Sequence, residues 1–255
     1  MMDNDKFIQL PDYGRLMVVT DLHGNFEDYK SYVDLWDEDD SDFHIVFTGD
    51  LIHSIHEDDG SIEILDDVID KSNRCSNFHV LLGNHEWAHI VNKDIYKNNE
   101  NLLADFINLV SFKKGYIEPS LTNYIKFFKT MPFFLKTANG LFVSHSGPSD
   151  KLYSIERFNE VLEGDYSDPI LYDFLWNRFN RFNDYTRKDV DAFLELMGLK
   201  YMLIGHNVVE SYTTFGNQVI MSSSFCTNVK TYLDLDLSKP LDSLDDLLKQ
   251  LKFLI

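Results

Sequence analysis

The chain has 255 residues, of which 44% are hydrophobic and 14% aromatic, a composition that supports a sizeable core and argues against a disordered chain. The formal charge of −19 disfavours nucleic acid and anionic membranes as partners, because a polyanionic surface repels both. Two cysteines are too few for a disulfide framework, and neither a secretory signal pattern nor an apolar run of the ~20 residues that a membrane helix needs is present. We therefore expect a cytoplasmic protein with reduced thiols.

The first part of the chain predicts strands that alternate with helices. Three apolar runs, Leu16–Thr20, Phe43–Thr48 and Phe78–Leu82, indicate buried strands. Amphipathic periodicity predicts helices over Phe26–Trp36 and Ser61–Lys71. This alternation is typical of βαβ units, in which the strands pair in parallel.

The rest of the chain predicts two helical regions and a return to strands. Residues Asn99–Lys129 and Lys151–Leu199 are expected to be mainly helical, and Leu241–Leu251 is expected to form a closing amphipathic helix. Asn-Gly and Gly-Asn pairs predict tight turns between neighbouring strands. The predicted strands of this part are Phe133–Thr137, Leu141–Ser144, Tyr201–Ile204, Tyr212–Phe215, Gln218–Ser222 and Val229–Leu235.

Six metal-binding side chains follow these strands, each with a glycine close by. They are Asp21, His23, Asp50, Asn84, His145 and His206. Ligands bind at the carboxyl ends of strands in open sheets, so we expect these side chains to converge. Asp50 has two carboxylate oxygens and can bridge two ions. Nitrogen and oxygen ligands without thiolate suit manganese, iron or zinc better than calcium.

Each of these residues alone also has a purely structural explanation. Asp-x-His and Gly-Asp sequences are common in turns, and Asn84 suits the N-cap of a helix. A single histidine such as His145 or His206 is commonly a partly buried residue with satisfied hydrogen bonds. The recurrence of all six types in order, each after an apolar run, instead favours a two-metal hydrolytic centre.

This ordered set closely resembles the calcineurin-like metallophosphoesterases, and specifically their phosphoprotein phosphatase family. The family motif G-D-x-H-G is present as Thr20–Gly24 with Thr in the leading position, and G-N-H-E is intact as Gly83–Glu86. His145–Gly147 is similar to the family's His-Gly, with a serine inserted. Gly205–Glu210 resembles the Ala-His-Gln-Val-Val-Glu of eukaryotic-type members, and Ser222–Cys226 stands where they carry Ser-Ala-Pro-Asn-Tyr-Cys.

The resemblance spans roughly Leu16 to Cys226 and implies an α/β fold of the metallophosphoesterase type. That fold is a β-sandwich of two mixed sheets flanked by helices, here a single catalytic domain over residues 1–255. The resemblance implies one metal held by Asp21, His23 and Asp50. It implies a second metal held by Asp50, Asn84, His145 and His206. We expect two divalent ions, manganese first and iron or zinc as alternatives, with a hydroxide between them as nucleophile.

The second motif departs from the family pattern G-D-x-x-D-R-G. His53 and Ser54 stand where the family carries Asp and Arg, of which the Asp orients the general-acid histidine and the Arg grips phosphate. The resemblance assigns the general-acid role to His85, and we expect His53 to contact it in place of the Asp. Alternative replacements for the Asp are His56, Glu57 and Asp58.

Leu175–Arg178 resembles the Trp-Asn-Arg of phage and bacterial members, in which the arginine holds phosphate. Arg178 is therefore expected to bind the substrate phosphate. Arg181 and Arg187, in the same predicted helical region, are alternatives, and any of these arginines can instead pair with the excess carboxylates of the chain.

The predicted function is metal-dependent hydrolysis of phosphomonoesters, with serine/threonine phosphoproteins as the first choice of substrate. One alternative is hydrolysis of a dinucleoside polyphosphate or another small phosphoester. Another is a catalytically weakened phosphate-binding scaffold, which the loss of Asp and Arg at His53 and Ser54 motivates. The cost of burying carboxylates and imidazoles together without a metal argues against the scaffold.

Overall fold

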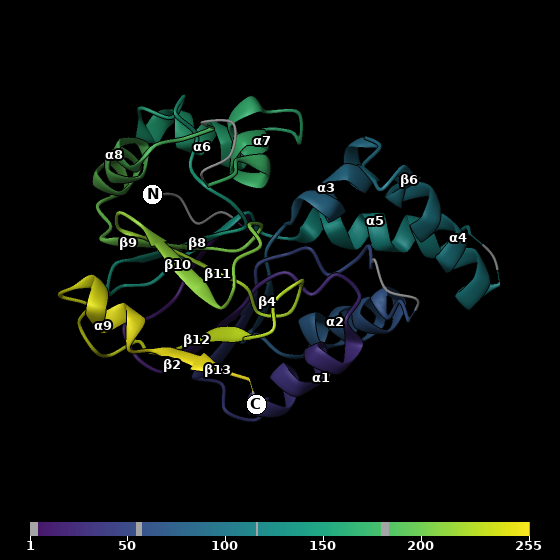
Figure 1. Cartoon of the computed structure of the whole chain (residues 1–255), viewed down its shortest axis with the longest axis horizontal. Coiled ribbons are helices and arrows are strands. Elements are labelled where there is room, and N and C mark those ends of the chain that lie inside the picture. The colour runs from purple at the N-terminus through teal and green to yellow at the C-terminus, as the bar shows by residue number, and fades with distance from the viewer. Residues whose placement is uncertain (1–4, 55–57, 116, 180–183, 255) are drawn as a thin grey trace.

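The structure is a computed structural model that describes residues 5–54, 58–115, 117–179 and 184–254. Two mixed sheets lie face to face between outer layers of helices (Figure 1), which confirms the predicted sandwich. The larger sheet has the strand order β1 (Phe7–Gln9), β7 (Phe134–Lys136), β8 (Leu141–Ser144), β9 (Tyr201–Ile204), β11 (Gln218–Met221) and β10 (Tyr212–Phe215). The smaller sheet has the order β13 (Leu251–Phe253), β12 (Thr231–Asp236), β2 (Arg15–Val19), β3 (Phe43–Phe47) and β4 (Phe78–Val80).

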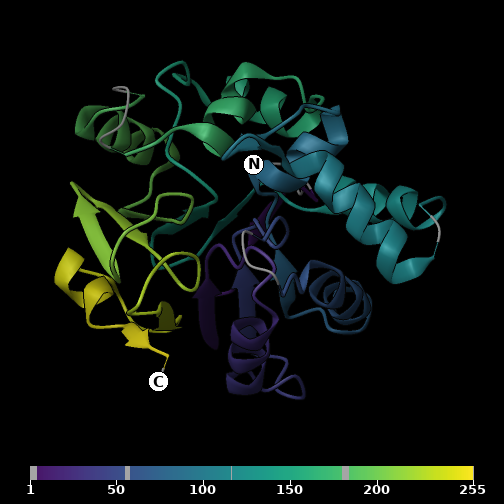
Figure 2. The same cartoon turned by 45° about the vertical axis from the view of Figure 1, so that its right-hand side comes forward.

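Helices cover the outer faces of both sheets, and a short hairpin extends beside them. The helices are α1 (Phe26–Leu35), α2 (Ser61–Arg74), α3 (Asn84–Val91), α4 (Leu102–Lys114), α5 (Ser120–Thr130), α6 (Ile155–Glu163), α7 (Pro169–Trp176), α8 (Arg187–Met197) and α9 (Leu244–Leu248). The hairpin pairs β5 (Tyr96–Lys97) with β6 (Glu100–Asn101). Figures 1 and 2 show α6, α7 and α8 on one side of the sandwich and α1 and α2 on the other.

Alternate side chains of each strand divide the core into layers. On β2, Leu16 and Val18 join the cluster between the two sheets, whereas Met17 and Val19 join the cluster that contains Tyr29 of α1. This division follows from the two-residue period of a strand, which sends neighbouring side chains to opposite faces. Both faces of β2 are apolar because both are covered, as parallel sheets require.

The helices α6, α7 and α8 pack on the larger sheet through phenylalanines. Phe142 of β8 lies 4.8 Å from Phe193 of α8, and Phe134 of β7 lies 4.8 Å from Phe174 of α7, measured between ring centroids. Both pairs have edge-to-face geometry, which the quadrupole of the rings favours. This aromatic layer anchors β7 and β8, and β8 leads to His145 at the carboxyl edge of the larger sheet.

Two predicted segments differ from the structure, and strand β1 lay outside the predictions. Leu251 begins strand β13, paired with Leu233, so the closing helix is shorter than predicted and ends at Leu248. Asn99 does not begin a helix, because Asn98 and Asn99 form the turn of the β5–β6 hairpin with φ of 52° and 69°, a conformation that asparagine tolerates. Strand β1 was not predicted, since three residues are too few to show a period.

Two further features bear on the sequence predictions. Cys75 and Cys226 are free thiols. In the part of the chain that the structure describes, no helix combines the length and apolar character that crossing a bilayer requires.

Candidate metal centre

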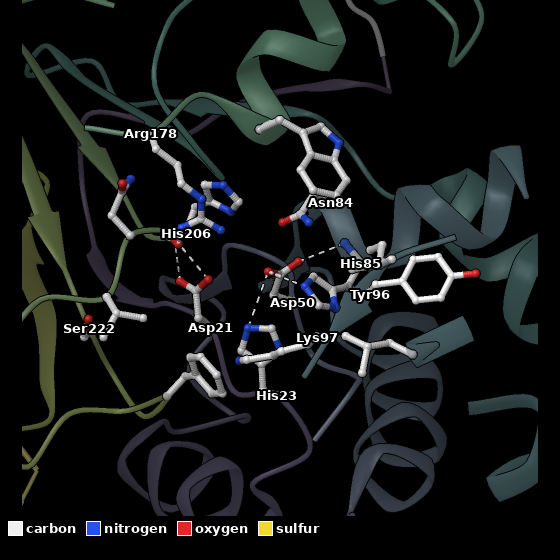
Figure 3. Close-up of a pocket in the computed structure, with 16 residues that line it drawn as sticks. Asp21, His23, Asp50, Asn84, His85, Tyr96, Lys97, Arg178, His206 and Ser222 are labelled. Atoms are coloured by element: carbon white, nitrogen blue, oxygen red, sulfur yellow. Dashed lines mark hydrogen bonds and ion pairs between the residues drawn. The ribbon is translucent and has the colours of Figure 1, made fainter. Parts of the chain in front are cut away.

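The strands of both sheets bring the six predicted ligands to one place. Asp21 and His23 follow β2, Asp50 follows β3, Asn84 begins α3 after β4, His145 follows β8 and His206 follows β9. Figure 3 shows five of them around one pocket, and His145 joins the group through contacts with Asn84 and His206. The pocket has a volume of about 450 Å³. All six ligands are buried.

The carboxylate of Asp50 lies at the centre of the group. Its Oδ2 atom is 3.6 Å from His23 Nε2, 3.5 Å from His145 Nε2 and 3.8 Å from His85 Nε2. Two sets of potential ligand atoms share this carboxylate, and in each set the atoms lie within 4.8 Å of one another: His23, Asp50 and His85, and Asp50, His145 and His206. The first set contains His85 in the place where the resemblance implies Asp21. An aspartate shared by two such sets is the arrangement that a bridging ligand needs.

The tautomers of two histidines make the centre rich in lone pairs. His145 Nδ1 lies 2.9 Å from the carbonyl oxygen of Thr48, and His23 Nδ1 lies 3.1 Å from that of Ile52. A carbonyl only accepts, so both Nδ1 atoms donate and both Nε2 atoms are left as unprotonated acceptors. His145 Nε2 then faces Asn84 Oδ1 at 2.9 Å.

Acceptor atoms that face one another repel unless a cation lies among them. Carboxylate, amide and imidazole acceptors of this kind match the ligand preferences of divalent transition metals, and the carbonyl contacts are those that orient metal-bound histidines. The residues present therefore fit a centre for divalent ions.

Burial dominates the electrostatics of the centre. It raises the pKa of Asp21 to about 7 and that of Asp50 well above its usual range, because a carboxylate loses its hydration there. It lowers the pKa of His23 to about 3 and also lowers the pKa values of His145 and His206, which favours neutral imidazoles. Neutral imidazoles are the form that binds metal.

Left-handed backbone conformations are concentrated in this region. Asp21, His23, Asp50 and His206 have φ of 30°, 45°, 53° and 61°, and His53 has 69°. Such conformations cost of order 1–3 kcal/mol each for residues other than glycine. Asp21, His23, Asp50 and His206 follow strand ends, and their side chains line the pocket.

Glu86 of the Gly-Asn-His-Glu motif holds the backbone that carries Asp50. Its Oε2 accepts a hydrogen bond of 2.9 Å from the Asp50 N–H, and its Oε1 accepts one of 2.8 Å from the Leu51 N–H. The His85 N–H in turn donates to Asp50 Oδ1 at 3.1 Å. A side chain at Gly83 would collide with Asp50, so glycine is required where these two turns meet.

The segment after β11 supports Asp21. Thr20, which replaces the family's leading glycine, donates its N–H to Ser223 Oγ at 2.8 Å. The Phe225 N–H donates to the Asp21 carbonyl at 3.2 Å, and the Phe225 ring lies 4.1 Å from the His23 ring. The Asp21 carboxylate accepts the His206 N–H at 2.9 Å, which ties the two sheets together at the centre.

Three histidines form a continuous chain beside Asp50. His53 Nδ1 lies 2.6 Å from His85 Nδ1, and His53 Nε2 lies 2.9 Å from His89 Nε2. The predicted contact between His53 and His85 is therefore present. His89 was missed by the sequence analysis, although its i, i+4 spacing from His85 places both on one face of α3. Burial lowers the pKa values of all three.

Arg178 lies in the pocket, opposite the β5–β6 hairpin (Figure 3). Its Nη1 donates to the carbonyl oxygen of His206 at 2.8 Å, and its backbone N–H donates to Asp184 Oδ2 at 2.8 Å. The predicted helical region Lys151–Leu199 is interrupted here. The helix α7 ends at Trp176 and α8 begins at Arg187, so Arg178 and Arg187 do not share a helix.

Two of the alternative residues for phosphate binding and acid orientation, Arg187 and Asp58, lie outside the pocket. The Arg187 guanidinium packs over the Phe215 ring at 5.3 Å and does not line the pocket. Asp58 lines a separate pocket with Ser54 and Phe112. Arg181, His56 and Glu57 lie outside the described residues.

The pocket also contains residues that the sequence analysis did not select. Tyr96 and Lys97 of strand β5 line its wall, as does Phe225, which lies in the Ser222–Cys226 segment but was assigned no role from the sequence. Their sequence surroundings have no glycine-flanked motif, and only the tertiary structure brings them to the centre.

Comparison with known proteins agrees with this geometry. A family model described as calcineurin-like phosphoesterase matches residues 14–210. No curated protein matches the chain. A protein serine/threonine phosphatase from Saccharomyces cerevisiae has a similar structure, with a TM-score of 0.71 and 18% identity over 98% of this chain and 83% of that one.

Two other solved structures are similar in fold. A cold-active protein-tyrosine phosphatase of a psychrophilic Shewanella species has a TM-score of 0.66 and 15% identity, over 98% of this chain and 84% of that one. A candidate diadenosine tetraphosphatase has a TM-score of 0.51 and 14% identity, over 90% and 92% of the two chains. At these identities the similarity establishes the fold, and the substrates of the three proteins differ.

Proposed function

The chain belongs to the calcineurin-like phosphoesterase family, and from that premise we propose that it hydrolyses phosphomonoesters at a dimetal centre, with serine/threonine phosphoproteins as substrates. The observation that carries the proposal is the convergence of carboxylate oxygens and unprotonated imidazole nitrogens around Asp50 Oδ2. We also propose that residues 1–255 act as one catalytic domain.

In this proposal Asp50 would help to hold both of two divalent ions, and Asp21 and His23 would complete one site. The second site is completed by Asn84, His145 and His206. Ions held in this way would supply a water of lowered pKa that attacks phosphorus at neutral pH. We expect manganese to be the native metal. The hydrogen bonds from His23 and His145 to backbone carbonyls hold both Nε2 atoms toward the ions.

Arg178 binds the phosphoryl oxygens. Its guanidinium carries donors in a planar fork that matches phosphate, and its bond to the His206 carbonyl fixes it beside a metal ligand. In the transition state it stabilises negative charge on the equatorial oxygens.

His85 protonates the leaving oxygen through Nε2, because its Nδ1 is engaged by His53. A neutral imidazole stabilises the charged form of His85 less than a carboxylate does, and burial already disfavours that form. The enzyme is therefore expected to depend weakly on His85 when the leaving group needs little protonation, and to prefer aryl phosphates over alkyl phosphates.

The choice of phosphoproteins rests on the resemblance of Gly205–Glu210 to eukaryotic-type phosphatases. The same centre is also compatible with hydrolysis of small phosphoesters, because surface loops and not the metal ligands determine which substrate is bound.

The test is turnover by the chelator-treated protein after manganese is restored. p-Nitrophenyl phosphate is assayed first, then phosphoserine, phosphothreonine and phosphotyrosine peptides and a dinucleoside polyphosphate, with Asp50→Asn as the inactive control. Turnover of phosphoserine or phosphothreonine peptides above the other substrates supports the proposal. Preference for the dinucleotide would replace phosphoproteins by small molecules. Two bound ions with no turnover of any substrate would favour a phosphate-binding scaffold.

A further inference from the structure

The β5–β6 hairpin carries a lysine to the mouth of the metal pocket. Lys97 pairs with Glu100 in this hairpin, and the two-residue turn has positive φ at both Asn98 and Asn99. That turn matches the twist of the strands and makes a defined hairpin. The Leu102 N–H donates to the Ile95 carbonyl at 2.9 Å and closes its base.

Lys97 packs over the residue that covers a metal ligand. Its Nζ lies 4.1 Å from the centroid of the Phe225 ring, and that ring lies 4.1 Å from the ring of His23. A cation over an aromatic face is held there by the ring quadrupole. Phe225 thus positions the ammonium beside the centre, on the side of the pocket opposite Arg178 (Figure 3).

The ammonium of Lys97 has no polar partner among residues 5–54, 58–115, 117–179 and 184–254. It makes neither an ion pair nor a hydrogen bond with any of them, although the chain carries 42 acidic residues against 23 basic ones. Burial lowers the pKa of Lys97, and its charge acts on Asp50 and Arg178. A half-buried cation that the described residues leave unpaired at the pocket mouth is available for an anion.

The chain also lacks the arginine that its relatives carry in the second motif. Ser54 stands at that position and lines a neighbouring pocket with Asp58 and Gly60. A phosphoryl group at the centre therefore meets Arg178 from one wall and Lys97 from the other.

We propose that Lys97 binds the phosphoryl oxygens of the substrate opposite Arg178, and so supplies from the β5–β6 hairpin the second cation that Ser54 does not. This inference rests on the proposed phosphoesterase function and adds a phosphate-binding residue to it. Lysine acts as a compact point charge on phosphate. Lys97 therefore contributes mainly to the affinity for the phosphate dianion and less to the orientation of that dianion.

The test compares Lys97→Met and Lys97→Arg with the wild type. Lys93→Met is the matched control, because Lys93 also lies over aromatic rings, 4.5 Å from that of Tyr172, but outside the pocket. Inorganic phosphate binding to the manganese-loaded protein is measured by calorimetry, and KM and kcat for p-nitrophenyl phosphate are measured separately. Metal content is determined for every variant.

Lys97→Met is expected to weaken phosphate binding and raise KM by roughly tenfold to a hundredfold, the value of a charged hydrogen bond, with unchanged metal content. Lys97→Arg restores most of the affinity, and Lys93→Met leaves both constants unchanged. Equal phosphate affinity in Lys97→Met and wild type would overturn the inference, as would a wild type that binds no phosphate. Phosphate binding that depends on Lys97 without any turnover would instead retain the inference and reject the proposed catalytic function.

Discussion

The Nδ1 atoms of His53 and His85 lie 2.6 Å apart, so an imidazole occupies the place from which a carboxylate orients the general acid in related enzymes. His53 is buried and in turn contacts His89 at 2.9 Å. Two hydrogen bonds in series need one donor and one acceptor at each contact, so the protonation of one imidazole determines the tautomers of the other two. The proposed general acid, His85, is therefore supported by a chain of neutral rings.

His53→Asp is expected to increase kcat for alkyl phosphates by about tenfold, because a carboxylate stabilises the His85 imidazolium that general-acid catalysis needs. The same variant should change kcat for p-nitrophenyl phosphate little, since that leaving group needs no proton. The ratio of the two kcat values is the measurement, and His53→Asn is the neutral control. If His53→Asp increased kcat for p-nitrophenyl phosphate more than kcat for alkyl phosphates, His53 would not act through His85.

His89→Phe removes the partner of His53 Nε2 while retaining an aromatic ring against Phe106 and Phe128. We expect kcat for alkyl phosphates to fall by about tenfold, because His53 loses the contact that fixes its tautomer and orientation. His89→Gln keeps a side-chain donor and acceptor and should recover part of the loss. If His89→Phe and His89→Gln lowered kcat equally for alkyl and aryl phosphates, the role of His89 would be one of packing alone.

Metal affinity of the chelator-treated protein is expected to fall as pH is lowered from 8 to 6. Burial raises the pKa of Asp21 to about 7, so below that pH a proton on the carboxylate competes with the metal. His23, with its pKa lowered to about 3, stays neutral through this range and does not compete. The decline approaches about tenfold per pH unit for one competing proton.

Calorimetric titration with manganese at pH 6, 7 and 8 measures this dependence. Asp21→Asn is the control: it should bind more weakly at every pH and show a flatter profile, because the competing proton is gone. Identical affinities for the wild type at pH 6 and pH 8 would contradict the prediction.

Glu86→Gln is expected to weaken metal binding by about tenfold to a hundredfold, because it replaces one of the two acceptors that hold the Asp50 and Leu51 N–H groups with a donor. The backbone of the bridging aspartate then shifts, although no ligand is removed. Metal stoichiometry after dialysis, with circular dichroism to verify folding, is the measurement. Full retention of two ions would show that the turn at Asp50 holds its geometry without Glu86.

Much of the candidate centre could be predicted from local sequence. The end of a strand and the turn after it are determined by neighbouring residues. The apolar runs before Asp21, Asp50 and His145 therefore indicated both the strand and the edge of the sheet at which each side chain lies. The six candidate ligands were selected in this way, whereas His85 and Arg178 were selected from the family resemblance. The contact of His53 with His85 was expected from the position of His53 in the second motif, where the family carries Asp.

The remaining features depend on contacts between distant segments. Lys97 and Phe225 are 128 positions apart in the numbering, and their 4.1 Å contact exists only because the hairpin and the segment after β11 meet over His23. Leu251 forms a strand because β12 offers it an edge, although its local pattern favours a helix. The sequence alone predicted the metal-binding chemistry and the layered fold, because both depend on short-range patterns: apolar runs and the glycine-flanked polar residues that follow them. Only the tertiary structure decided which rings support His85 and which cation faces the pocket, because burial and charge there are set by residues remote in the chain.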